Sequence, residues 1–386
     1  MNNQNLINSM AVDAKELNDL LSKKKTGEIK SIKYIKNSSQ TIYYGVPGCG
    51  KSNKIDEETI NTSDEQKMRV VFHPEYTNAD FVGQILPTNV DGNVEYKFRP
   101  GPLSKILRRA YLHPDKKYYL IVEEINRGNA AAIFGEYFQL LDRIAAKKEV
   151  PANGYTYTEG WSSYSIENEF INWYIRENLY ADVNHKLQNE DDGIAKKSDD
   201  ESQKAIEIGN LHFSANTGIR LPPNLSILAT MNTSDQNVFI LDNAFQRRWD
   251  MVLVKNEFGD DSKNQRDARI AGSKITWEKF QEVINKKISQ FSKENNFSSM
   301  IDKRLGCWFV KAVPDKNDAN GKYIITEDSF KNKILKYLWD DAFKFCHEDV
   351  FEDADNFEAL LEKVKMDNPD FGVFKNVDFS EKEEEN

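Results

Sequence analysis

The first 250 residues alternate between short apolar runs and amphipathic stretches. Runs rich in β-branched and aromatic residues predict buried strands at 41–45, 68–73 and 118–122, and at 225–235, where the strand ends in polar residues. Apolar residues at helical spacing predict helices at 11–24, 102–112 and 131–144. Strands that alternate with helices are typical of a parallel sheet with helices on both faces, so we expect an α/β fold.

The pattern changes between about 150 and 220, where we expect an insert in the α/β region. Residues 153–165 are rich in aromatic and turn residues and predict a hairpin. Residues 167–178 predict a short helix. The charged stretch 189–203 has almost no apolar residues, so it predicts a mobile loop.

Helical periodicity dominates from residue 256 onward. The stretches 277–291 and 330–346 carry wide apolar faces, which indicates a separate helical domain. The final SEKEEEN is an acidic tail that we expect to be disordered. The predicted organisation is a short helical extension at 1–38, an α/β domain at 39–255, a helical domain at 256–375 and an acidic tail at 376–386.

Composition limits the class of protein. The chain has 386 residues, 39% hydrophobic and 30% charged, which fits a globular protein with a polar surface. It has no apolar run long enough to cross a bilayer, and its start lacks the layout of a signal peptide. Three widely spaced cysteines form neither a disulfide framework nor a zinc knuckle. We therefore expect a cytoplasmic location and no membrane association.

The charge balance bears on nucleic acid as a partner. The net charge is −10 and the pI is about 5.3, whereas a dedicated DNA-binding domain is usually basic. If nucleic acid is involved, we expect its contact to be local or to be made by a partner.

The stretch GVPGCGKS at 45–52 carries the first chemistry. It follows a predicted strand and a helix must start near its end, which is the context of a P-loop. Glycines permit positive φ, so that successive N–H groups and the helix N-terminus face phosphates. Lys51 would reach the β- and γ-phosphates, and the Ser52 hydroxyl would bind Mg²⁺. The other predicted phosphate-binding positions are Gly45, Pro47, Gly48, Cys49 and Gly50, with Cys49 as a small filler. The alternative is a turn that ends in Lys-Ser by chance.

The strand at 118–122 runs into two carboxylates, Glu123 and Glu124. A P-loop site needs such a strand, with one acid toward the Mg²⁺ shell and the other toward the attacking water. We assign Glu123 to the metal and Glu124 to water activation. Acids are common at exposed strand ends, but the upstream P-loop favours these roles.

Two later segments add polar candidates. If the third strand lies between the other two, Asn232 at its tip could contact the γ-phosphate or orient the water; otherwise it is a turn-forming residue. Arg247 and Arg248 follow a short helical stretch. One of them could reach a neighbouring subunit's γ-phosphate as an arginine finger, or it could pair locally with Asp242.

Together these segments resemble the AAA+ superfamily, and more narrowly its McrB-like branch, the motor subunits of McrBC-type modification-dependent restriction systems. The resemblance covers roughly 40–350. It is carried by GVPGCGKS (45–52), EEINRGN (123–129), MNTSDQN (231–237) and LDNAFQRRW (241–249). Further similar segments are FHPEYTNADFVG (72–83), YKFRPGPLSKIL (96–107) and DKRLGCWFV (302–310), the last in the family's lid.

The resemblance implies an AAA+ nucleotide-binding domain with a helical lid, assembled as a homo-oligomeric ring, usually a hexamer, with active sites between subunits. It implies Mg²⁺-dependent hydrolysis of GTP or ATP. It also implies an McrC-like partner that carries the nuclease, so that DNA is reached through the complex. It places Asn126 and Arg127 at the nucleotide site near the subunit interface, and Asn232 and Asp235 in the sensor-1 signature.

Two features depart from the family pattern. The Walker B position that is normally Asp holds Glu123, whose extra methylene shifts the carboxylate; octahedral Mg²⁺ is strict about geometry, so hydrolysis could be slower. Only about 40 residues precede the sheet, too few for the DNA-reading domain that McrB-type proteins often carry. We therefore expect target recognition in a partner or in the insert.

Two other functions stay open. A MoxR-type ATPase that remodels proteins would share the P-loop and the ring, although the EINRGN and MNTSD strings fit it less well. A nucleotide-binding scaffold with weak hydrolysis is favoured by Glu123. The McrB-like motor fits the motifs best.

Overall fold

The computed structural model describes residues 34–36, 38–90, 93–177, 205–233, 239–294, 302–316 and 321–379. The helix predicted at 11–24, the loop predicted at 189–203 and the SEKEEEN tail lie outside these residues. The chain divides into two compact units. The first comprises the described residues of 1–42, 55–230 and 237–251, and the second those of 43–54, 231–236 and 252–386. The predicted domain boundaries stay predictions.

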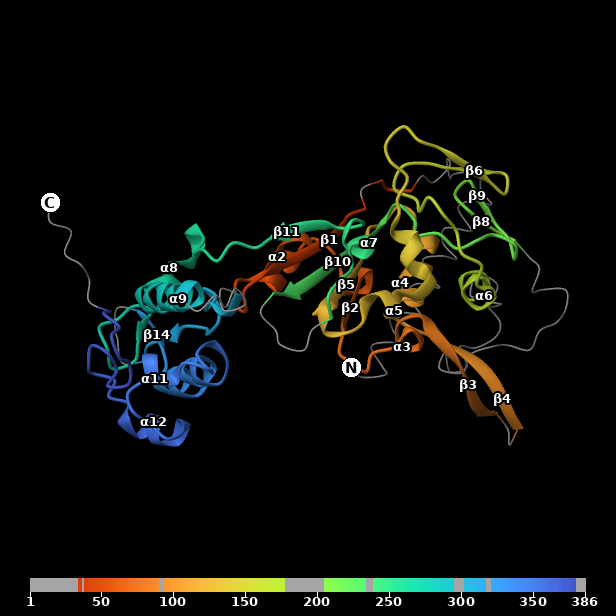
Figure 1. Cartoon of the computed structure of the whole chain (residues 1–386). Coiled ribbons are helices and arrows are strands. Elements are labelled where there is room, and N and C mark those ends of the chain that lie inside the picture. Colours follow the sequence, from red (N-terminus) through yellow and green to blue (C-terminus); the bar gives the residue numbers. More distant parts are fainter. Residues whose placement is uncertain are drawn as a thin grey trace. The chain divides into compact units, whose positions relative to one another are not determined.

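Five strands form the central sheet, and Figure 1 labels them. Their order is β11 (Asp250–Leu253), β1 (Gln40–Gly45), β10 (Leu225–Asn232), β5 (Tyr118–Glu123) and β2 (Lys67–Val71). β5 runs parallel to both neighbours, with Leu120 opposite Ile227 on one side and Met68 on the other. Its first five residues are buried, as expected for an inner strand covered on both faces. The predicted strands and the α/β class are confirmed, and β10 does lie between β1 and β5.

The helices of the first unit pack around this sheet. The helix predicted at 102–112 is confirmed as α4 (Pro102–Leu112), with proline in its first turn, where a missing N–H costs no hydrogen bond. Leu103, Ile106, Leu107 and Ala110 form its buried stripe. Shorter helices of this unit are α3 (Asn78–Val82), α5 (Ala130–Phe134) and α7 (Asn243–Gln246), whereas α2 (Lys51–Glu58) begins in the second unit and ends in the first. Short 3₁₀ turns are Asp64–Gln66, Ile125–Arg127, Gly135–Leu141 and Asp260–Ser262.

The single helix predicted at 131–144 is wrong. The α-helix ends at Phe134, and the chain continues as a 3₁₀ turn from Gly135 to Leu141. Gly135 has φ +54 and ψ −133, a conformation that interrupts the helical ladder and that glycine adopts readily. The side-chain amide of Asn78 donates to the carbonyl of Ile133 at 2.8 Å and satisfies one of the last helical acceptors.

Three antiparallel hairpins extend the first unit. They are β3 (Gly83–Val90) with β4 (Asn93–Pro100), β6 (Val150–Ala152) with β7 (Tyr155–Tyr157), and β8 (Ile206–Ile208) with β9 (Leu211–Phe213). The hairpin β6–β7 turns at Asn153-Gly154, both with positive φ, and confirms the predicted hairpin. The predicted short helix is present as α6 (Glu169–Glu177). Trp161 is buried in the insert, where its ring contacts Tyr157.

A partly buried arginine ties the insert to the sheet. Arg143 donates from Nε to Gln40 at the start of β1, and from its two terminal nitrogens to four main-chain carbonyls. One of these carbonyls belongs to Leu225 at the start of β10. Burial lowers the pKa of Arg143 to about 9. The guanidinium therefore joins three segments of the chain, at Gln40, Gly160 and 221–225, through hydrogen bonds.

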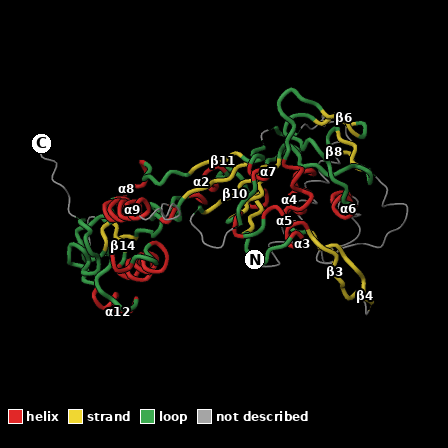
Figure 2. Tube along the Cα trace, viewed as in Figure 1, coloured by secondary structure: helices red, strands yellow, loops and turns green. Residues whose placement is uncertain are grey.

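The second unit is mainly helical after residue 256 (Figure 2). The helix predicted at 277–291 is confirmed as α9 (Trp277–Glu294), which packs Trp277, Phe280 and Ile284 into the core of this unit. The stretch predicted at 330–346 is helical up to Ala342, but its turns at Phe330–Leu335 and Leu338–Ala342 are π-helical. The remaining elements are α8 (Lys263–Arg266), α10 (Glu327–Ser329), α11 (His347–Val350), α12 (Phe357–Lys363) and a small sheet of β12 (Arg269–Ile270), β14 (Tyr323–Ile325) and β13 (Val313–Pro314).

Candidate functional site

The glycine-rich loop follows β1 directly, as the sequence predicts. Gly48 and Gly50 have φ angles of +75 and +96, in the left-handed region that favours glycine. A Cβ added at Gly48 would lie 2.6 Å from the backbone of Phe309, so this position also needs the absence of a side chain. The loop runs into α2, whose first turn begins with Lys51 and Ser52. The first turn of a helix presents unpaired N–H groups, which suit an anion.

Lys51 is folded onto the loop that precedes it. Its ammonium donates to the carbonyl oxygens of Gly45 at 3.0 Å and Val46 at 3.1 Å, and the residue is 7% exposed. The ammonium therefore lies at the loop, as a phosphate-binding lysine must. Ser52, the next residue, is exposed.

The other side of the loop is anchored by the segment 305–309. The N–H of Gly306 donates to the carbonyl of Pro47 at 3.0 Å, and the N–H of Trp308 donates to the carbonyl of Gly48 at 2.8 Å. Cys49 is buried against Val46 and Val254. Burial raises the pKa of the Cys49 thiol, which suits the predicted role of a small filler. Pro47 and Cys49 thus serve the loop's shape.

The two acids at the end of β5 lie beside residues that the sequence did not single out. One carboxylate oxygen of Glu123 accepts from Arg69 of β2, and the other accepts from the Thr230 hydroxyl of β10 at 2.5 Å. Arg69 also bonds to Asp56 of α2 at 2.5 Å. The Glu123 side chain is 13% exposed. The carboxylate is therefore fixed from both neighbouring strands.

Glu124 has an unusual backbone conformation. Its φ of 54 and ψ of 47 are left-handed, which is uncommon for a residue with a side chain. Its N–H donates to the Thr230 hydroxyl at 3.0 Å, and its carbonyl accepts from the N–H of Arg127 at 2.9 Å. The Nε of Arg127 lies 3.6 Å from the Glu124 carboxylate. Strained backbone at the end of a sheet strand is common at functional sites.

The remaining candidates on these strand ends have different exposures. Asn126 is buried, and its main-chain carbonyl accepts from the N–H of Phe239 at 2.7 Å. Asn232 ends β10 and is partly buried. Asp235 lies outside the described residues.

The two candidate finger arginines differ. Arg248 points inward: it bonds to Asp142 at 2.7 Å and lies 4.1 Å from the ring centre of Phe138. Arg247 is exposed, and within the described part of the chain its guanidinium has no hydrogen bond or ion pair. Asp242 pairs with neither; its carboxylate accepts from the N–H of Phe245 and caps α7. The local ion pair considered from the sequence is therefore wrong.

Two residues that contact Glu123, namely Arg69 and Thr230, were not predicted as site residues. Arg69 is a charged residue inside an apolar strand, and Thr230 is a polar residue inside another. A buried polar residue within a strand needs a partner, so Thr230, which is 1% exposed, carried a signal, whereas the Arg69 side chain is 40% exposed and gave none. The partners themselves lie 54 and 107 residues away in the chain, at Glu123.

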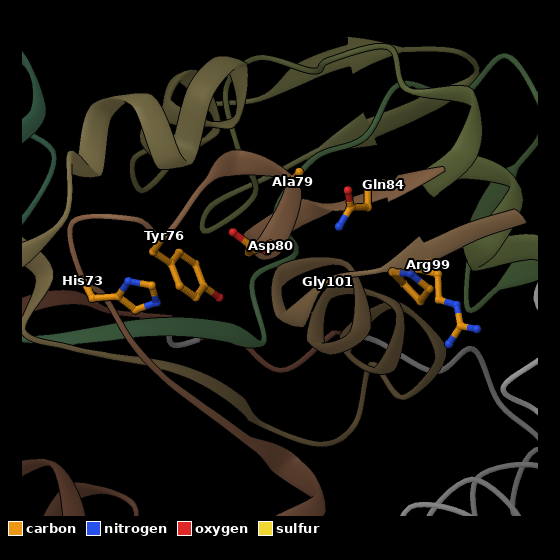
Figure 3. A pocket seen from close by; sticks show the side chains of 8 residues that line it. His73, Tyr76, Ala79, Asp80, Gln84, Arg99 and Gly101 are labelled. Carbon is orange, nitrogen blue, oxygen red and sulfur yellow. The ribbon is translucent and has the colours of Figure 1, made fainter. Parts of the chain in front are cut away.

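A cavity of about 400 Å³ lies elsewhere in the first unit, near α3 and the base of the β3–β4 hairpin. Figure 3 shows His73 and Tyr76 at one end and Arg99 at the other. The two rings at the first end meet edge to face, with centres 5.4 Å apart. None of the predicted site residues lines this cavity.

The side chains that could bind a metal ion are few at any one place in the described residues. Among the residues that the structure describes, no group of three or more His, Cys, Asp or Glu side chains could hold a metal ion alone. Mg²⁺ at nucleotide sites instead uses one or two protein ligands, with phosphates and water supplying the rest. The assignment of Ser52 and Glu123 to the metal therefore stays a prediction.

Comparisons with known proteins agree with this chemistry. Residues 40–152 match the profile of the AAA domain (dynein-related subfamily). The type II restriction enzyme BsuMI component YdiS of Bacillus subtilis (strain 168) is 28% identical over 384 residues, covering 91% of this chain and 93% of that protein. The type IV methyl-directed restriction enzyme EcoKMcrB subunit of Escherichia coli (strain K12) is 23% identical over 341 residues, covering 85% of this chain and 60% of that protein.

The parallel sheet with its flanking helices agrees with this AAA-domain match, which covers residues 40–152. The chain is similar to these two components of restriction systems, in agreement with the McrB-like motifs. Across the described residues, no helix combines the length and the apolar composition that crossing a membrane requires.

Proposed function

We propose that this protein is a Mg²⁺-dependent nucleoside triphosphatase that hydrolyses GTP or ATP as the motor subunit of an McrBC-like restriction complex. The observation that carries the proposal is the placement of Lys51, buried against the glycine-rich loop at the first turn of α2. A lysine in this position binds phosphate as a point charge. The acids at the end of β5 supply the second requirement, carboxylates for the metal shell and the water.

In this proposal the loop and the first turn of α2 bind the phosphates. Lys51 exchanges its carbonyl partners for the β- and γ-phosphates, and the loop N–H groups bind the remaining oxygens. Ser52 and Glu123 hold Mg²⁺ or its water. The metal, when bound, neutralises charge that develops on the phosphates.

Glu124 is the proposed base for the attacking water. Its left-handed backbone and its contact with Arg127 fix where its carboxylate lies. Asn232, at the tip of β10, is proposed to orient the water or the γ-phosphate, and Asn126 and Asp235 are proposed to support the same site.

Arg247 is the proposed arginine finger. It is exposed, whereas Arg248 is held by Asp142 and Phe138. A finger must reach the site of a neighbouring copy, so the proposal includes a homo-oligomeric ring, most simply a hexamer. The finger would stabilise charge in the transition state.

The relatives' names suggest the wider role. One is called a component of a type II restriction enzyme and the other a subunit of a type IV methyl-directed restriction enzyme. We extend this to a cytoplasmic antiviral complex, in which an McrC-like partner carries the nuclease and makes the main contact with DNA. The net charge of −10 supports contact through a partner.

A scaffold that binds nucleotide but hydrolyses it slowly is the second candidate. The specific observation in its favour is the contact of Arg69 with Glu123. A guanidinium on the Walker B carboxylate competes with a metal cation for the same oxygens.

Steady-state phosphate release with GTP and with ATP, measured beside Glu124→Gln, tests the proposal. We expect turnover of at least one nucleotide by the wild type and its loss in the variant, with nucleotide binding retained. Tight binding without turnover of either nucleotide would contradict the motor and favour the scaffold. Absence of nucleotide binding would contradict both the motor and the scaffold.

A further inference from the structure

Thr230 joins the two acids of the candidate site. It lies in β10, is 1% exposed, and follows Ala229, which pairs with Val122 of β5. Its hydroxyl accepts from the N–H of Glu124 at 3.0 Å and donates to the Glu123 carboxylate at 2.5 Å. One hydroxyl therefore touches the main chain of one acid and the side chain of the other.

The direction of both bonds is fixed by chemistry. A threonine hydroxyl has one hydrogen to donate and lone pairs to accept. The N–H of Glu124 is only a donor, so the hydroxyl must accept from it. The single hydroxyl hydrogen is then available for the Glu123 carboxylate, which accepts. No other residue at 230 except serine offers this pair of bonds with so short a side chain.

The left-handed backbone of Glu124 needs such support. A residue with a side chain is disfavoured at φ 54 and persists there only when its surroundings fix it. The bond from the Glu124 N–H to the Thr230 hydroxyl holds the peptide group that precedes the Cα of Glu124. The bond from the Arg127 N–H to the Glu124 carbonyl holds the peptide group that follows the Cα of Glu124.

We infer that Thr230 is a positioning residue for hydrolysis, which sets the conformation of Glu124 and the orientation of the Glu123 carboxylate. The inference rests on the proposed function, since it concerns how the proposed base and metal-shell acid are held. Thr230 itself touches neither nucleotide nor water in this role. Its loss should therefore lower kcat and leave nucleotide binding almost unchanged.

The test compares Thr230→Val with two controls in the purified full chain. Valine keeps the branched shape and removes the hydroxyl. Thr230→Ser restores the hydroxyl without the methyl group. Thr217→Val is the matched control, because Thr217 is 3% exposed and its hydroxyl also accepts from a main-chain N–H, that of Ser214 at 2.8 Å.

Phosphate release with GTP and with ATP gives kcat and KM, and titration of a fluorescent analogue of each nucleotide gives Kd. For Thr230→Val we expect kcat to fall about 10- to 100-fold, the size of effect that misplacing a catalytic group produces. Kd should change less than about twofold, since the phosphate contacts are intact. Thr230→Ser should recover most of the lost kcat, and Thr217→Val should lower the melting temperature without a matching loss of kcat.

The outcomes separate this inference from the proposed function. Wild-type turnover that is unchanged in Thr230→Val would overturn the inference and leave the function standing. Equal losses of kcat in Thr230→Val and Thr217→Val, or a serine variant as poor as the valine one, would overturn it as well. No phosphate release by the wild type from either nucleotide would remove the proposed function and the inference together.

Discussion

The ammonium nitrogen of Lys51 lies 3.0 Å from the carbonyl oxygen of Gly45, the first glycine of the loop that precedes it. The same nitrogen bonds to Val46 at 3.1 Å, so the loop curves around its own lysine. A carbonyl is a weaker partner for an ammonium than a phosphate oxygen, because the phosphate carries charge. Lys51 is thus placed at the loop, and a phosphate oxygen would be a stronger partner for its ammonium than these carbonyls.

Replacing Lys51 with alanine should abolish measurable nucleotide binding. The variant loses the cation that contacts phosphate, a charge-assisted contact of about 1.5–3 kcal/mol, and it loses the bonds that shape the loop. Titration with a fluorescent GTP or ATP analogue measures the effect. Lys54→Ala is the control, since Lys54 is an exposed lysine of the same helix and lies outside the loop. Unchanged affinity in Lys51→Ala would rule out the P-loop assignment.

Arg247 and Arg248 should respond differently to replacement by alanine. Arg247→Ala should lose turnover and keep its stability, because its exposed side chain makes no hydrogen bond or ion pair among the described residues. Arg248→Ala should lose about 1–3 kcal/mol of unfolding free energy, because it breaks the bond to Asp142 and uncovers Phe138. Urea unfolding and phosphate release, measured on both variants, distinguish the two roles.

The same arginine offers a test of a shared active site. If Arg247 acts on the neighbouring copy, mixing Arg247→Ala with Glu124→Gln should restore part of the activity, since some interfaces then combine an intact finger with an intact base. The control is each variant mixed with itself. Absence of rescue at every mixing ratio would contradict a finger that acts between copies.

The sequence predicted the residues that belong to contiguous motifs. Lys51 and Gly48 are specified by the loop that contains them, and Glu123 and Glu124 by the strand that ends there. Their partners were not predicted, because those contacts join strands that are distant in the chain. The bond from Thr230 to Glu123 spans 107 residues, and its existence depends on the register of β10 against β5.

The misassigned helix at 131–144 has a different cause. Its apolar spacing is helical throughout, and only Gly135 argues against one continuous helix. Glycine inside a helix costs about 1 kcal/mol relative to alanine, which spacing alone does not reveal. A tertiary contact supports the end of the helix, since the side-chain amide of Asn78 donates to the carbonyl of Ile133.

Arg143 should be a large contributor to the stability of the first unit. Arg143→Met keeps a flexible apolar stem and removes a partly buried guanidinium that donates to Gln40 and to four carbonyls. These acceptors would lose their donor, which should cost about 3 kcal/mol or more of unfolding free energy. Arg266→Met, which breaks only exposed contacts with Asp267 and Glu278, should change stability little. Equal urea midpoints for the two variants would contradict the role assigned to Arg143.

Tyr76 should make stability fall with rising pH in the alkaline range. Burial, aided by the charge of Asp80, raises the pKa of Tyr76 to about 12, above its ordinary value of 10.0. Between these values the unfolded chain releases the phenol proton while the folded chain keeps it, so the unfolded state binds fewer protons and unfolding becomes easier as pH rises. The contribution is complete below pH 10 and is lost as pH approaches 12. Urea unfolding from pH 9.5 to 11.5 should therefore show a shallower decline in Tyr76→Phe than in the wild type. Tyr164→Phe, at a tyrosine that is 57% exposed, should decline as the wild type does, and a Tyr76→Phe slope equal to the wild-type slope would contradict the assignment.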